Sequence, residues 1–95
     1  MYAVYTEVNA TDADVPAARE FLPNVVAPRA RETGAIGGYW LAPINGIGVS
    51  VVVFDTEEAA QALVARFEVG KPPAPDAPEG ITVRLVEVRE VLASL

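Results

Sequence analysis

Residues 47–60 read Ile-Gly-Val-Ser-Val-Val-Val-Phe-Asp-Thr-Glu-Glu-Ala-Ala, and they place a strand directly before a helix. The run Ile47–Phe54 is rich in β-branched residues and apolar on both faces, which predicts a strand. Asp55 can cap the next helix while Glu58 reaches back toward it. We therefore expect a helix over Thr56–Phe67, with its apolar face turned to the sheet.

The chain just before this strand predicts a hairpin partner. Gly37–Ala42 reads as a strand, and Pro43–Gly46 ends in the Asn-Gly pair that is typical of a two-residue hairpin turn. The two strands are therefore expected to pair as antiparallel neighbours.

Further upstream, Val15–Glu32 carries apolar residues at helical spacing. Asp14 is the expected cap of this helix, and Gly34 is expected to end it. Because Pro23 and Pro28 each remove a backbone donor, we expect a kink, or two short helices in place of one.

The two ends of the chain predict the remaining strands. Tyr2–Val8 and Ile81–Leu92 are both rich in β-branched or aromatic residues, and the proline-rich stretch Gly70–Gly80 is expected to be a stiff, extended connector. The order is then β-α-β-β-α-β. This order predicts an α+β, ferredoxin-like fold, with two helices on one face of a four-stranded antiparallel sheet. At 95 residues, the chain is expected to form one domain over residues 1–95.

Composition excludes several classes of function. The net charge of −6 disfavours nucleic acid and anionic membranes as partners. Cys and His are both absent, which removes disulfides, thiol nucleophiles, zinc–thiolate sites and His-ligated haem. The carboxylates show no metal-site spacing, and no apolar run is long enough to cross a bilayer. We expect a cytoplasmic protein with no bound metal and no cofactor.

The strand Ile47–Phe54 has apolar side chains on both faces, and both have to be shielded from water. One layer of helices hides one face of a sheet, so the second apolar face would lie in water. We therefore expect a symmetric homodimer with the two sheets packed face to face. The end of the chain, Val91–Leu95, is expected to cross to the partner and close the sheet edges. Whichever of Val51 and Val52 faces the partner is expected not to tolerate aspartate.

This pattern resembles the dimeric α/β-barrel superfamily, and within it the antibiotic-biosynthesis monooxygenase-like domains. The resemblance rests on Asn9-Ala10 followed by Val15-Pro16, on Gly34–Trp40 before the second strand, and on Val53–Ala60 at the strand–helix junction. Thr33 stands where the family usually has proline. The resemblance implies a dimeric barrel that oxidises a small aromatic or quinol substrate with O2, without metal or flavin.

The resemblance also separates branches of that superfamily. The haem-degrading branch has a Trp on its second helix, where this chain has Leu63, and a His after that helix, which this chain lacks. Haem degradation is therefore not expected. The quinol- and anthrone-oxidising branch uses Asn, Trp, Arg and Tyr, and Asn9 is the residue that aligns with it.

Three residues of the first strand are the candidate catalytic groups. The resemblance implies that Asn9 binds the substrate anion in a pocket between sheet and helices. Tyr5 and Glu7 share its face of the strand, so they are expected to form a polar cluster with it on the helix-covered side. Glu7 would serve there as proton acceptor. In the alternative interpretation, Asn9 forms a turn before the helix, and Glu7 lies in water or pairs with an arginine.

Four residues are the candidate substrate-binding groups, and they are Trp40, Phe21, Leu63 and Phe67. Trp40 can stack on a planar ligand, or it can be a core or dimer-interface aromatic. Among the basic residues, Arg84 is expected in a cross-strand or intersubunit ion pair. The other arginines of the helices, Arg19, Arg29, Arg31 and Arg66, are expected on solvent faces.

Two functions from different classes therefore remain open. The first is a cofactor-independent monooxygenase-like enzyme, which requires a cavity of about 300 Å³ or more with Asn9 and a second polar group converging on it. The second is a non-catalytic dimeric module that binds a small hydrophobic ligand or serves assembly only, and a cavity filled by Phe21, Leu63 and Phe67 favours it. Isomerase or decarboxylase chemistry on a lactone needs an acid–base pair that the sequence does not reveal.

Overall fold

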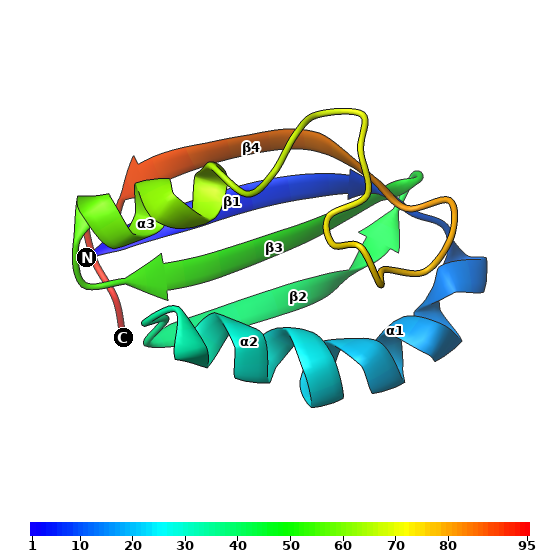
Figure 1. The fold of residues 1–95 in the computed structure, drawn as a ribbon, viewed down its shortest axis with the longest axis horizontal. Helices are drawn as coiled ribbons and strands as arrows, with labels where there is room; N and C mark the ends of the chain where they lie inside the picture. The colour runs from blue at the N-terminus through cyan, green and yellow to red at the C-terminus, as the bar shows by residue number, and fades with distance from the viewer.

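The computed structural model describes residues 1–95 and has an α+β, ferredoxin-like fold (Figure 1). A four-stranded antiparallel sheet has the strand order β2-β3-β1-β4. The helices lie on one side of this sheet, as predicted (Figure 1). The strands are β1 (Tyr2–Asn9), β2 (Gly37–Ile44), β3 (Ile47–Phe54) and β4 (Thr82–Glu90), and the helices are α1 (Val15–Phe21), α2 (Ala27–Glu32) and α3 (Glu57–Val64).

The predicted hairpin joins β2 and β3. Asn45 and Gly46 form its turn, with φ of 54° and 80°, the left-handed backbone that Asn-Gly adopts in such turns. β3 has the predicted bounds. β2 runs to Ile44, two residues beyond the predicted end, because its pairing with β3 resumes after an irregularity that follows Leu41.

The first helical segment is interrupted, as its prolines predict. A π-helical turn over Leu22–Val26 separates α1 from α2, and the Ala27 N–H donates to the carbonyl of Leu22. Pro23 lies in this turn and has no N–H, which is a known cause of such an interruption. Asp14 stands at the N-cap position of α1, as predicted, but its side chain makes no capping hydrogen bond to that helix. Its carboxylate instead accepts from the backbone N–H of Thr11 at 2.8 Å, at the start of the short turn Asp12–Asp14.

The second helix and the last strand are both shorter than predicted. α3 ends at Val64, and its cap is Thr56, not Asp55, because the Thr56 hydroxyl accepts from the Ala59 N–H at 3.2 Å. β4 ends at Glu90. The pairing of β4 with β1 shifts by one residue near Arg84, which forms a bulge there.

The core lies between the sheet and the helices. Val4, Val52 and Phe54 are 0%, 5% and 0% exposed, and they pack against Ala60 of α3. No element covers the opposite side of the sheet, which we call the open face (Figure 1). Val51 lies on the open face, since it alternates with the buried Val52. None of the three helices has the length and apolar character needed to cross a membrane.

Candidate functional site

A large cavity lies between the sheet and the helical layer. Its volume is about 790 Å³, and 20 of the 34 residues that line it are hydrophobic. Its floor comes from β1, β2 and β3, and α1, the π-helical turn and α2 supply one wall. This volume lies within the usual range for sites that enclose a small organic molecule.

All four candidate substrate-binding residues line this cavity: Trp40, Phe21, Leu63 and Phe67. Phe21 belongs to α1, Leu63 to α3, and Phe67 follows α3. These apolar side chains leave the cavity open rather than filled, so the space is available to a planar molecule. Contact of these residues with a substrate stays a prediction.

The floor of the cavity contains a polar row that the sequence analysis missed. Trp40 pairs with Ser50 in the register of β2 and β3, and Ser50 pairs with Thr6 in the register of β3 and β1. All three line the cavity, and Thr6 is only 5% exposed. The signal in the sequence was Ser50, which interrupts a run of valines at a helix-facing position. The row offers an aromatic ring and two hydroxyl groups to a ligand.

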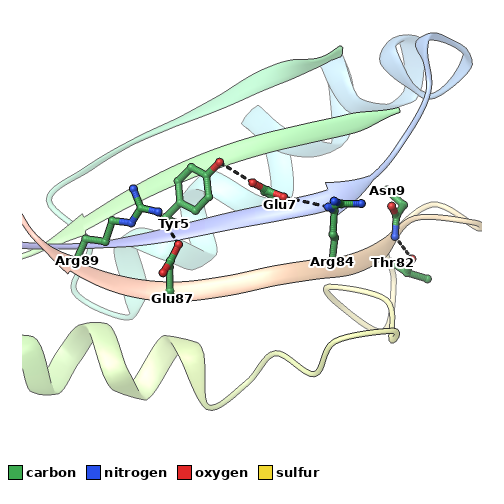
Figure 2. Close-up of polar contacts among 7 residues, drawn as sticks. All are labelled: Tyr5, Glu7, Asn9, Thr82, Arg84, Glu87 and Arg89. Carbon is green, nitrogen blue, oxygen red and sulfur yellow. Dashed lines mark hydrogen bonds and ion pairs between the residues drawn. The ribbon is translucent and has the colours of Figure 1, made fainter. Parts of the chain in front are cut away.

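The structure places Tyr5 and Glu7 on the open face, so their predicted position on the helix-covered side is wrong. The alternation of β1 explains this, because Val4 and Thr6 are buried beneath the helices and their odd-numbered neighbours must point the other way. In Figure 2 the two side chains lie on the side of the strands away from α3. Neither residue lines the cavity.

Tyr5 and Glu7 belong to a hydrogen-bonded network on the open face (Figure 2). The Tyr5 hydroxyl donates to Glu7 Oε2 at 2.8 Å, and Arg84 Nε donates to Glu7 Oε1 at 3.1 Å. Both carboxylate oxygens of Glu7 are thus engaged, and the alternative prediction that Glu7 pairs with an arginine is confirmed. The hydrogen bond to Glu7 is the main cause that raises the pKa of Tyr5 above 10.0.

The same network contains a charged pair on β4. The Arg89 guanidinium lies 4.7 Å from the centroid of the Tyr5 ring, a cation–π distance, and donates to Glu87 Oε1 at 2.6 Å. The hydrogen bond to Glu87 is the main cause that raises the pKa of Arg89. Together with the pair of Arg84 and Glu7, which is the predicted cross-strand ion pair, the charged pair on β4 gives the open face two arginines and two glutamates of balanced charge.

Asn9 also lies outside the cavity. It is the last residue of β1, it is exposed, and its side-chain Nδ2 donates to Thr82 Oγ1 at 3.1 Å (Figure 2). β1 thus includes Asn9, so the alternative prediction of a turn at Asn9 is wrong. The convergence of Asn9 on the cavity is not observed.

The proline-rich connector (residues 70–80) closes part of the cavity. In Figure 1 it crosses the helix-covered side of the sheet, and five of its residues line the cavity: Pro73, Ala74, Pro75, Ala77 and Pro78. Asp76, at its middle, accepts two hydrogen bonds from Arg29 of α2, at 2.8 and 2.5 Å. These bonds are the main cause that lowers the pKa of Asp76 below 3.8. The connector is thus fastened across the cavity.

Three of the arginines predicted on solvent faces stand at the edge of the cavity. Arg19, Arg29 and Arg66 are exposed, as predicted, and they also line the cavity. Asp14 is the acidic residue of the lining. No three acidic side chains come together as a metal site would require.

The comparisons show which fold this is. A crystal structure of an MhuD mutant, with two manganese protoporphyrin IX molecules bound per active site, has a similar fold with a TM-score of 0.63. The similarity covers 100% of this chain and 98% of that one, at 15% sequence identity. No protein-family model matches the chain. No curated protein matches it either.

Proposed function

We propose that this protein binds a small planar aromatic molecule of the phenol or quinol class in the cavity and oxidises it with O2, as a cofactor-independent monooxygenase-like enzyme. The observation that carries the proposal is the cavity of about 790 Å³, with apolar walls and the row of Trp40, Ser50 and Thr6 on its floor. The similarity of the fold to MhuD, and the sequence resemblance to antibiotic-biosynthesis monooxygenase-like domains, support it.

The chemistry asks the protein to hold an anion and exclude water. The indole of Trp40 stacks on the ring, and the hydroxyls of Ser50 and Thr6 donate to its oxygen. The cavity takes up the anion, whose proton has gone to bulk water. For an anthrone, a methylene carbon becomes a carbonyl: one atom of O2 enters as that carbonyl oxygen and the other leaves as water. The carbon loses four electrons and O2 gains four.

The proposed site does not use the candidate catalytic residues of β1. Asn9, Glu7 and Tyr5 lie outside the cavity, so Ser50 and Thr6 take the role of binding the substrate oxygen. A catalytic role for these three residues stays a prediction, and it requires a ligand on the open face.

A metalloporphyrin, the ligand of MhuD, does not fit the donors of this chain. Iron in porphyrin is held by His, Cys, Met or Tyr, and the chain has no His or Cys. Met1, Tyr2 and Tyr5 do not line the cavity. The side chain of Tyr39 is on the open face, since Tyr39 pairs with Val51, and it is 74% exposed. We therefore propose no step that involves a porphyrin.

We further propose that the active form is a homodimer joined through the open face. Tyr39 and Leu41 are 74% and 56% exposed there, beside the half-buried Val49 and Val51. An apolar strip of this kind is typical of an interface rather than of a surface in water. The charged network around Glu7 lies next to this strip on β1 and β4.

The second candidate function is a non-catalytic module that binds a small hydrophobic ligand. The placement of Glu7 favours it, since this candidate base lies outside the cavity and is engaged by Tyr5 and Arg84. Both candidates need the same cavity, so binding and turnover have to be measured separately.

The test combines ligand binding with oxygen consumption. Trp40 is the single tryptophan of the chain, so quenching of its emission reports binding in the cavity. A panel of hydroquinones and anthrones is then supplied to an oxygen electrode with wild type, Ser50→Ala and Asn9→Ala. We expect turnover that Ser50→Ala reduces and Asn9→Ala retains. Binding without turnover favours the non-catalytic module, and loss of turnover in Asn9→Ala alone moves the site to the open face.

A further inference from the structure

The cavity differs in charge from the molecule that contains it. The whole chain has a net charge of −6, whereas the charged residues that line the cavity are three arginines and one aspartate. These four residues together carry a net charge of +2. Three of the seven basic residues of an acidic protein thus lie around one apolar cavity.

Two of these arginines have no carboxylate partner. Arg29 is paired with Asp76, and the other ion pairs of the structure join Arg84 to Glu7 and Arg89 to Glu87. Arg19 and Arg66 take part in none of them. The one acidic residue of the lining, Asp14, accepts a hydrogen bond from the Thr11 backbone at 2.8 Å. The edge of the cavity therefore has two solvent-exposed guanidinium groups without a fixed anion.

These two arginines come from different elements. Arg19 belongs to α1, and Arg66 lies two residues after α3. A guanidinium is planar and suits a carboxylate, to which it can donate two parallel hydrogen bonds. The apolar remainder of the cavity suits a hydrocarbon ring. A ligand that satisfies both parts has a planar aromatic body and an acidic substituent.

We propose that the natural ligand is an aromatic carboxylate, whose ring lies in the apolar cavity and whose acidic group is bound by Arg19 and Arg66. This inference rests on the proposed function, since it names the class of molecule that the same cavity binds. It adds a property that a phenol or quinol need not have, which is a permanent negative charge at neutral pH.

The test compares naphthoate with its neutral methyl ester, using Trp40 emission and calorimetry. We expect naphthoate to bind about a hundredfold more tightly than methyl naphthoate, since each of the two arginines contributes about tenfold, the ratio that one charged hydrogen bond commonly gives. Arg19→Gln and Arg66→Gln are each expected to weaken naphthoate binding about tenfold and to leave binding of the ester unchanged. Added salt should weaken binding of naphthoate only.

Three controls separate charge from structure. Lys71→Gln removes the same charge from a residue outside the cavity lining and is expected to leave naphthoate binding unchanged. Arg66→Lys keeps the charge and should retain part of the affinity. Circular dichroism establishes that each variant is folded, which is expected because Arg19 and Arg66 are both exposed.

The outcomes separate this inference from the proposed function. If both probes bind equally well and the arginine variants change neither affinity, the inference is wrong while binding in the cavity stands. If neither probe quenches Trp40 nor releases heat, the inference is wrong, and oxygen consumption with the hydroquinones and anthrones decides the proposed function.

Discussion

Gly38 and Trp40 lie two residues apart on the cavity side of β2, and the glycine makes room for the indole. A Cβ at position 38 would lie 3.3 Å from the Cη2 atom of Trp40 and 3.2 Å from the carbonyl oxygen of Val51. Gly38→Ala is therefore expected to displace the Trp40 ring, shift its emission and weaken binding of naphthoate. Crowding of this kind commonly costs ~1–3 kcal/mol of unfolding free energy, which urea denaturation measures.

Gly37 supplies the matched control for this substitution. A Cβ there meets nothing within 4 Å, and the backbone of both positions is that of a strand. Gly37→Ala should leave the emission of Trp40 and the affinity for naphthoate as they are in wild type. Equal effects from the two variants would mean that the general stiffening of the strand, and not the fit of the indole, is responsible.

At the scale of elements, the connector and α2 are joined by the pair of Arg29 and Asp76. Asp76→Asn is expected to loosen residues 70–80 without unfolding the sheet, because the pair is exposed and joins only these two segments. Hydrogen exchange should then rise in the connector and remain unchanged in β1 and β3. Association and dissociation of naphthoate should both become faster, which stopped-flow fluorescence measures.

The same pair gives the connector a pH dependence with a definite sign. The pKa of Asp76 is lower in the folded protein than its ordinary 3.8. The stability that the pair with Arg29 gives to the connector is therefore present above pH 3.8 and is lost as the pH falls through the lowered pKa. Glu79→Gln, in the same connector but in no ion pair, is the control. Exchange in the connector that is unchanged by Asp76→Asn at neutral pH would contradict this account.

The elements also show what the sequence could predict. Local patterns were sufficient for β3, for the Asn-Gly turn and for the interruption near Pro23, because each depends on neighbouring residues. The fastening of the connector was not predictable, since Arg29 and Asp76 are 47 residues apart in the chain. The bulge at Arg84 likewise depends on the pairing of β4 with β1.

The error in the site arose from the choice of face for β1. The prediction that Tyr5, Glu7 and Asn9 share one face of the strand was correct. That face was then placed on the helix-covered side because Asn9 resembles a pocket residue of the family. The chemistry of the strand itself favoured the other choice. Glu7 carries a charge, and the opposite face presents Val4, which is 0% exposed in the folded chain.

At the scale of the whole molecule, substitutions in β3 can test dimer formation and folding separately, because neighbouring side chains of this strand point to opposite faces of the sheet. Val51 lies on the open face and Val52, 5% exposed, lies in the core, so aspartate at the two positions should have different effects. Val52→Asp buries a charge without a partner and is expected to prevent folding. Val51→Asp is expected to fold as a monomer of 10.0 kDa, while wild type has twice that mass in light scattering. Val69→Asp, at a valine that is 62% exposed and lies outside the four strands, should remain a dimer. A wild-type protein that scatters as a monomer at micromolar concentration, or a Val51→Asp variant that stays dimeric, would contradict association through the open face.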